Sequence, residues 1–333
     1  MVVAKVFKFE KQFDGFPQET DLKLVEEQLP EIKDGEFLAE AVYLSVDPYM
    51  RAYAPRLPLG ETYVGGQVAK VTESKNPKFP VGKYVVAHFG WRTHTISDGK
   101  RTPGWTIPMV LPDFGGLPAS LALGVLGMPG NTAYFGVTDI LQPQQGHTVA
   151  VTGAAGAVGS LVGQICKIKG CKVIGIAGSD EKGKWLVDEL GFDSFINYKS
   201  DDVGKALKEA APQGVDRYFD NVGGEISSTI INQHMKNFGR VAVCGCISGY
   251  NEKEPPKATP IQKGVLRHQL RMQGLHSTRW EDKWMEGILQ NKKWIEEGRL
   301  KYRETVTEGF ENMFKAFTDM LRGGNFGKAI VKV

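Results

Sequence analysis

Cysteine is scarce in this sequence of 333 residues. The four cysteines are Cys166, Cys171, Cys244 and Cys246. Their spacing resembles neither a disulfide framework nor a set of paired zinc ligands, and residues 1–165 contain none. A catalytic zinc ion usually takes Cys, His and carboxylate ligands, and the early histidines His88 and His94 have no thiol near them in the sequence. We therefore expect no metal site and a reducing, cytoplasmic setting.

Long apolar runs and one-sided charge are also missing. No apolar run is long enough to span a membrane, and charged residues interrupt the apolar N-terminus, which therefore does not read as a cleavable signal. The 41 basic and 38 acidic residues are mixed along the chain, without the dense basic stripe of a nucleic-acid-binding protein. We expect a small-molecule partner, and neither nucleic acid nor membrane.

Glycine is concentrated at one informative place. Gly153, Gly156 and Gly159 stand at a spacing of three and end an apolar run that begins at Val149. The run favours a strand, and the apolar spacing over 160–169 favours a helix. Glycines in such a turn let the backbone approach a pyrophosphate, and the helix N-terminus offers N–H groups to its charge. The pattern predicts a dinucleotide site.

The length exceeds that at which single cores usually stop growing, so we expect two domains. Short β-like runs broken by Gly and Pro indicate an irregular β-domain, and the later alternation of strands with helical stretches is typical of an α/β doubly wound parallel sheet. The strands predicted for the β-domain are 4–9, 37–45, 66–71 and 83–89. Those predicted for the parallel sheet are 148–152, 172–177, 194–197, 216–220, 240–244 and 271–275. We further predict a surface loop over 251–260, a helix over 284–297, and a β-like tail that rejoins the first domain.

The residues after the second strand of the sheet decide which dinucleotide is favoured. An acid there binds the ribose 2′-hydroxyl of NAD, whereas the 2′-phosphate of NADP needs space and a cation. Gly178 and Ser179 are small, and Lys182 supplies charge. Asp180 and Glu181 are either the ribose acid or first-turn acids of the next helix with Ser179 as N-cap, and we favour the second interpretation. The sequence therefore predicts NADPH/NADP+.

Six blocks in order carry a family resemblance, and they span most of the chain. They are Ser45-Val-Asp-Pro-Tyr-Met-Arg51, Gly127-Met-Pro-Gly-Asn-Thr-Ala-Tyr134, Gly153 to Gly159, Gly178 to Lys182, Phe219-Asp-Asn-Val-Gly-Gly224 and Cys244 to Tyr250. With them the chain resembles the zinc-free medium-chain dehydrogenase/reductases, most closely the alkenal/one oxidoreductases. The resemblance implies a chaperonin-10-like (GroES-like) substrate and catalytic β-domain of residues 1–125 plus 301–333, a Rossmann NADP-binding domain of residues 126–300, and a homodimer.

The resemblance also implies positions of cofactor contact. The pyrophosphate contacts are Gly156, Ala157, Val158 and Gly159, and the adenosine phosphate contacts are Lys182 and Tyr198. The remaining cofactor contacts are Asn221, Cys244, Gly245, Cys246, Ile247, Ser248, Gly249, Tyr250, Leu275, His276, Ser277 and Asn325. Cys244 and Cys246 are more simply explained by packing at the end of a buried strand than by a metal or redox pair.

Reduction of a C=C bond conjugated to a carbonyl suits a site without a metal, because hydride adds β to the carbonyl and hydrogen-bond donors stabilise the developing enolate. Tyr250 is the predicted catalytic donor; it either donates or only lines the pocket, with the nicotinamide ribose hydroxyl as donor. Tyr49, Arg56 and Tyr63 are the substrate candidates; Arg56 either attracts a fatty-acid carboxylate or is solvated. His276 is either a proton shuttle or a lining residue.

The predicted function is NADPH-dependent reduction of α,β-unsaturated ketones and aldehydes, as by a 15-oxo-prostaglandin 13-reductase or 2-alkenal reductase. The resemblance also implies NADP-dependent oxidation of the leukotriene B4 12-hydroxyl. Two alternatives stay open: an NADPH quinone reductase of the same fold, and a non-catalytic, crystallin-like NADPH-binding protein.

Overall fold

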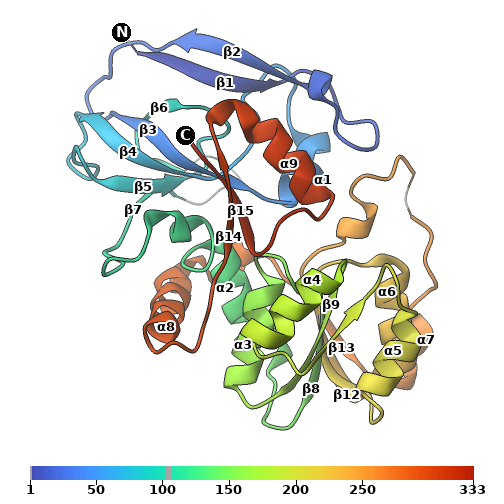
Figure 1. The fold of residues 1–333 in the computed structure, drawn as a ribbon. Helices are drawn as coiled ribbons and strands as arrows, with labels where there is room; N and C mark the ends of the chain where they lie inside the picture. Colours follow the sequence, from blue (N-terminus) through green and yellow to red (C-terminus); the bar gives the residue numbers. More distant parts are fainter. Residues whose placement is uncertain (1, 102–106, 255) are drawn as a thin grey trace. The chain divides into compact units, whose positions relative to one another are not determined.

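The computed structural model describes residues 2–101, 107–254 and 256–333, and the chain divides into two compact units. The first unit comprises Met1–Gly124 and Glu304–Val333, and the second comprises Val125–Arg303. Figure 1 labels the elements of both units along the chain. Pro255, in the predicted loop 251–260, and residues 102–106 lie outside the described residues.

A six-stranded parallel sheet forms the centre of the second unit. Its order is β10-β9-β8-β11-β12-β13, so the chain order reverses between β8 and β11. The strands are β8 (Thr148–Thr152), β9 (Lys172–Ala177), β10 (Ser194–Asn197), β11 (Val215–Asp220), β12 (Met235–Val243) and β13 (Arg271–Gly274). This is the doubly wound dinucleotide-binding arrangement, and the predicted fold class is confirmed.

Crossover helices connect the parallel strands of this sheet. The helices of the unit are α2 (Met128–Phe135), α3 (Gly159–Ile168), α4 (Asp180–Lys184), α5 (Val203–Ala210), α6 (Gly224–Thr229), α7 (Gln262–Arg267) and α8 (Trp284–Glu296). Short π-helical turns cover Gly136–Leu141, Trp185–Glu189 and Ile230–His234, and 3₁₀ turns cover Ile247–Gly249 and Ser277–Lys283. Close approach explains one helical glycine: a Cβ on Gly163 of α3 would lie 1.9 Å from the Phe192 ring.

Antiparallel pairing dominates the first unit. Its larger sheet has the order β14-β15-β3-β4-β5-β7, with β6 also paired to β3, and a two-stranded sheet joins β1 to β2. The strands are β1 (Val3–Phe9), β2 (Leu22–Gln28), β3 (Phe37–Val46), β4 (Gln67–Ser74), β5 (Tyr84–Ala87), β6 (His94–Ser97), β7 (Met109–Val110), β14 (Glu304–Glu308) and β15 (Lys328–Lys332). Helices α1 (Tyr49–Tyr53) and α9 (Met313–Leu321) and 3₁₀ turns at Glu19–Asp21, Ala54–Arg56, Ala119–Leu123 and Phe310–Asn312 complete it. The C-terminal tail thus returns to the first unit through the β15–β3 pairing.

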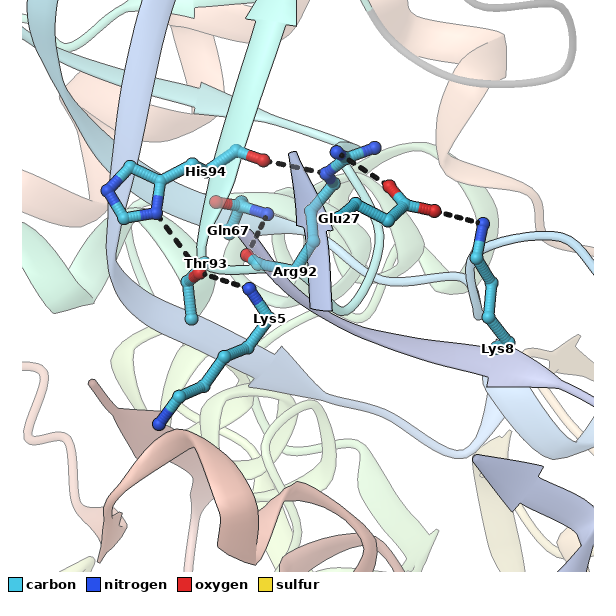
Figure 2. A network of polar contacts seen from close by, with 7 residues as sticks. All are labelled: Lys5, Lys8, Glu27, Gln67, Arg92, Thr93 and His94. Carbon is cyan, nitrogen blue, oxygen red and sulfur yellow. Dashed lines mark hydrogen bonds and ion pairs between the residues drawn. The ribbon is translucent and has the colours of Figure 1, made fainter. Parts of the chain in front are cut away.

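Polar contacts tie the small sheet of the first unit to the segment that leads into β6 (Figure 2). The Glu27 carboxylate of β2 lies 2.7 Å from the Lys8 ammonium and 3.2 Å from the Arg92 guanidinium. The backbone N–H of Lys5 donates to the Thr93 hydroxyl at 2.9 Å. These bonds fix the edge of β1 against a neighbouring segment, so this edge is not open to further strands.

Several strand boundaries differ from the sequence prediction, and β12 differs most. Strand β12 begins at Met235, five residues before the predicted start at Arg240, because the chain pairs with β11 across an irregularity between Val215 and Arg217. Strand β2 and the short strands β6 and β7 were not predicted. The alternating charges of β2 reflect a solvated face. Within the described residues, no helix combines the length and apolar character needed to cross a membrane.

Candidate functional site

The candidate site of the second unit lies at the carboxyl ends of its parallel strands. All six strands end at the same edge of the sheet, and β8 and β11 are neighbours at the point where the chain order reverses. In open α/β sheets, ligands bind outside the strand carboxyl ends at such a switch point. The loops that follow β8, β9, β10, β11, β12 and β13 therefore form one site-bearing edge.

The turn between β8 and α3 has the geometry that the glycine pattern predicts. Gly153 has φ of +60°, a conformation that favours glycine. A Cβ on Gly159 would lie 2.3 Å from the Gly153 carbonyl oxygen and 2.8 Å from the Ala154 Cα, so only glycine lets α3 start this close to β8. Gly156 differs, since a Cβ there would meet only the Gly153 oxygen at 3.2 Å. Ala157 and Val158 complete the turn, which has the strand–turn–helix geometry that suits an anion at a helix N-terminus.

At the end of β9, the structure supports one of the two interpretations of the acids. Ser179 is the N-cap of α4, and its hydroxyl accepts from the Lys182 backbone N–H at 3.3 Å. Asp180 and Glu181 occupy the first turn, as the helix dipole favours. The Asp180 carboxylate also accepts from the Asn197 side-chain amide at 2.8 Å, and this engages it inside the protein.

Basic and aromatic side chains lie beside this helix start. Burial and the nearby Lys199 lower the pKa of Lys182, while Glu181 opposes that shift. The Tyr198 ring lies over Gly178, because a Cβ on Gly178 would come within 3.0 Å of the tyrosine hydroxyl. Two ammonium groups, a hydroxyl and an aromatic face thus meet where a 2′-phosphate and adenosine are expected.

The loops after β11 and β12 are bonded together. Backbone N–H groups of Cys244, Ile247 and Ser248 donate to the carbonyl oxygens of Asp220, Asn221 and Val222 at 2.8, 3.3 and 3.1 Å, respectively. Gly245 and Gly249 lie in the same loop, and Cβ atoms there would come within 3.3 Å of Tyr250 and 3.0 Å of Pro256.

Tyr250 closes this loop upon itself. Its phenolic oxygen accepts from the Cys246 backbone N–H at 3.3 Å. Burial is the main cause that raises the pKa of Tyr250 to about 12. The phenol is therefore protonated at neutral pH and suited to donate a hydrogen bond.

The two cysteines of the loop have different environments. Burial, reinforced by the charge of Asp220, raises the pKa of the Cys244 thiol to about 12, consistent with the packing interpretation. Cys246 is exposed, so packing does not explain it, and that part of the sequence interpretation is wrong. The reason is that β12 ends at Val243 and the following residues leave the sheet.

The segment after β13 reaches the same edge. The Leu275 backbone N–H donates to the Val243 carbonyl at 2.8 Å, which aligns this segment with the end of β12. His276 is exposed, and its Nδ1 lies 2.7 Å from the Thr278 hydroxyl. Ser277 begins the 3₁₀ turn. The edge thus gathers every predicted cofactor residue except Asn325.

The other predicted residues lie in the first unit. The Asn325 side-chain amide donates to the Gly327 carbonyl at 2.8 Å in the turn before β15. Tyr49 begins α1, and burial is the largest cause that raises its pKa well above the usual value. Arg56 is exposed, with its guanidinium 5.8 Å from the Tyr53 ring centroid. Tyr63 is 0% exposed and donates to the Met50 carbonyl at 2.7 Å, so a core position replaces the predicted substrate contact.

Comparisons with known proteins give a consistent result. Residues 5–103 match the family described as "N-terminal domain of oxidoreductase", and residues 157–291 match "Zinc-binding dehydrogenase". The chain is 52% identical to prostaglandin reductase 1 from Bos taurus over 334 aligned positions, covering 100% of both chains. The chain belongs to the zinc-free medium-chain dehydrogenase/reductases.

Two further proteins are also similar to this chain. The NADPH-dependent curcumin reductase of Escherichia coli is 37% identical over 96% of this chain and 94% of its own length. The solved structure of CurA from Vibrio vulnificus in complex with NADPH has a TM-score of 0.91 at 36% identity, covering 99% of each chain. In the part of the chain that the structure describes, no group of three or more His, Cys, Asp or Glu residues could hold a metal ion.

The sequence analysis missed several residues that shape the site. Thr152, Asn197 and Asp220 are 1%, 7% and 3% exposed and hold the loops through hydrogen bonds. A polar residue that ends a buried strand of a parallel sheet is the signal that could have found all three.

Proposed function

We propose that this chain reduces the C=C bond of α,β-unsaturated ketones and aldehydes with NADPH. The chain is an NADP-dependent oxidoreductase that acts on C=C bonds. Its full-length identity of 52% to prostaglandin reductase 1 is the observation that carries this proposal. The 15-oxo-prostaglandins and 2-alkenals are the proposed substrates. Oxidation of the leukotriene B4 12-hydroxyl is a proposed second activity, in which the carbinol carbon gives its hydride to NADP+.

The residues at the sheet edge fit NADPH. The turn before α3, where a Cβ on Gly159 would not fit, suits the pyrophosphate. Gly156, Ala157 and Val158 form the rest of this turn. Ser179, Lys182 and Tyr198 suit the adenosine 2′-phosphate, because Asp180 is already engaged by Asn197. Asn221, the loop 244–250 and Leu275 to Ser277 suit the nicotinamide end, and Asn325 is proposed as a further contact.

The proposed chemistry needs one well-placed donor from the protein. NADPH supplies the hydride when bound. Hydride addition at the carbon β to the carbonyl would place negative charge on the carbonyl oxygen, and Tyr250 would donate a hydrogen bond to that oxygen and keep its proton. Its pKa of about 12 keeps the donor protonated across the neutral range. Solvent supplies the proton that completes the product at the α-carbon.

Substrate recognition is proposed for two residues of the first unit. The exposed Arg56 guanidinium is suited to attract the carboxylate of a fatty-acid-derived substrate, and Tyr49 offers an aromatic surface. Tyr63 takes no part in this proposal, because it is buried in the core. His276 is proposed only as a lining residue, since its side chain is exposed and bonded to Thr278.

We propose a homodimer in the cytoplasm. Strand β13 ends the six-stranded sheet, and a two-fold pairing of two such edges would extend it across two copies. The four cysteines are free thiols, as a reducing setting favours. Size-exclusion chromatography with light scattering tests the assembly, and a monomer mass would contradict it.

The function is tested by following NADPH absorbance with a 15-oxo-prostaglandin, a 2-alkenal and a quinone in parallel. We expect consumption with the first two at higher kcat/KM than with the quinone. Turnover of the quinone alone would replace this proposal by a quinone reductase. Binding of NADPH without turnover of any of the three would favour a non-catalytic, crystallin-like protein.

A further inference from the structure

A buried carboxylate ends β11 at the switch point of the sheet. Asp220 is 3% exposed. One carboxylate oxygen accepts from the Tyr218 hydroxyl at 2.9 Å and from the backbone N–H groups of Val222 and Gly223 at 3.0 and 2.9 Å. The other oxygen accepts from the Ser227 hydroxyl of α6 at 2.5 Å. The Thr152 hydroxyl is a further donor, 3.4 Å from the first oxygen. All of these donors are neutral.

The chain after β11 folds around this carboxylate. A buried charge is costly unless hydrogen bonds replace its hydration. Asp220 receives two hydrogen bonds from backbone N–H groups of the residues that follow it in the chain. Gly223 and Gly224 have φ of +69° and +61°, conformations that glycine adopts without strain. The carboxylate therefore sets the shape of the turn 221–224.

The same turn is bonded to the loop after β8. The Thr152 hydroxyl accepts from the Asn221 backbone N–H at 3.0 Å, and the Asn221 side-chain amide donates to the Thr152 carbonyl at 2.6 Å. A Cβ on Gly153 would lie 3.3 Å from the Asn221 Cβ. Displacement of the turn would thus move Asn221 away from the first glycine of the turn before α3.

On its other side, the turn holds the loop that carries Tyr250. The Asp220 carbonyl accepts from the Cys244 N–H at 2.8 Å, and the Val222 carbonyl accepts from the Ser248 hydroxyl and N–H at 2.6 and 3.1 Å. The position of this loop depends on where Val222 lies. The Asp220 carboxylate fixes Val222 through the N–H of that same residue.

We infer that Asp220 is a positioning residue for the cofactor site. In this role Asp220 itself makes no contact with the reacting atoms. Its carboxylate acts as a hydrogen-bond acceptor that fixes the turn 221–224, and through that turn it places Asn221 and the loop 244–250. The inference rests on the proposed function, because the nicotinamide end of NADPH is the ligand that those two segments would hold. It assigns the role to acceptor geometry and not to charge.

Three variants test this inference in the full-length protein. Asp220→Ala leaves the Val222 and Gly223 N–H groups without their acceptor, and we expect NADPH binding to weaken by about tenfold or more. Asp220→Asn keeps an acceptor oxygen for both N–H groups, and its amide can donate to the Ser227 hydroxyl oxygen; we expect binding within about threefold of the parent protein. Tyr218→Phe is the matched control, because it removes a donor to the same carboxylate, and the 3.3 Å contact of that hydroxyl with Thr152, but leaves the Val222 and Gly223 N–H bonds to Asp220 in place. We expect it to lower the melting temperature and leave NADPH affinity within about twofold.

Affinity is measured by titration of NADPH fluorescence, and folding by circular dichroism and thermal melting. A merely structural role predicts that folded Asp220→Ala binds NADPH as tightly as the parent protein, and that result would overturn the inference. If Asp220→Asn binds NADPH as weakly as Asp220→Ala does, that result would also overturn the inference. If Asp220→Ala does not fold, Asp220→Asn decides alone, and a loss of tenfold in this folded variant contradicts the acceptor role. A parent protein that fails to bind NADPH contradicts the proposed function instead.

Discussion

At the scale of single residues, Lys182 is the side chain that we expect to set the preference for NADPH over NADH. Its ammonium group is partly buried beside Lys199 and lies in a helix whose N-cap is Ser179. Lys182→Ala should lower kcat/KM for NADPH by about ten- to a hundredfold, because a charged hydrogen bond to phosphate is lost, and should change that for NADH by less than about threefold.

The matched control is Lys184→Ala, an exposed lysine of the same helix. It alters the charge of α4 equally, and we expect no change in cofactor preference. Steady-state kinetics with both cofactors at saturating enone provides the measurement. An unchanged preference in Lys182→Ala would place the phosphate elsewhere.

Tyr250 is the second residue with a distinct expected effect. Tyr250→Phe removes the phenolic donor and leaves the ring, so kcat for enone reduction should fall by about a hundredfold while KM for NADPH stays within about threefold. An unaffected kcat would assign the donor role to the nicotinamide ribose hydroxyl and leave Tyr250 as a wall of the pocket.

For single residues, the sequence predicts the local backbone conformation, but it does not predict contacts with segments that are distant in the chain. The glycine turn was predictable, because a positive φ and a missing Cβ are properties of the residue itself. The burial of Tyr63 was not, since its neighbours Trp91 and Phe317 come from distant parts of the chain. The role of Asn197 was hidden for the same reason, because its partner Asp180 follows a different strand.

Strand β15 shows how one element of the first unit is held in place. Lys328 is 3% exposed, and its ammonium group donates to the Val46 carbonyl at 2.6 Å, to Asp47 at 3.0 Å and to the Ala329 carbonyl at 2.8 Å. Burial is the largest cause that lowers the pKa of Lys328, and the nearby Asp47 opposes that shift. This buried pair fastens the returning tail to the end of β3.

Removal of the lysine alone should therefore be severe. Lys328→Met leaves the Asp47 carboxylate buried without its cation, and we expect a loss of about 3 to 5 kcal/mol in the free energy of unfolding, measured with urea. Lys332→Met, at the exposed end of the same strand, should change it by less than about 0.5 kcal/mol. The addition of Asp47→Asn to Lys328→Met should recover part of the loss, and a further decrease would contradict the pairing account.

The elements themselves were largely predictable in the second unit. Three of its six strands, 148–152, 172–177 and 194–197, begin and end where the sequence places them, because buried parallel strands are short apolar runs bounded by turn residues. The first unit was harder, since half-solvated strands such as β2 alternate apolar with charged residues and resemble a polar loop.

The whole molecule joins a doubly wound unit to a β-rich unit formed from both ends of the chain. The order of motifs along the sequence was enough to predict that fold class, because each block is local. The cofactor followed from residues close together in the sequence. The substrate did not, since its recognition depends on side chains brought from separate segments.

The central claim is that hydride reaches the carbon β to the carbonyl and that the carbonyl survives. The direct test is to supply NADPH deuterated at the nicotinamide C4 with a 2-alkenal or an enone and to locate the label by NMR. The account predicts a saturated aldehyde or ketone with deuterium on the β-carbon. Deuterium on the carbinol carbon of an allylic alcohol would contradict it.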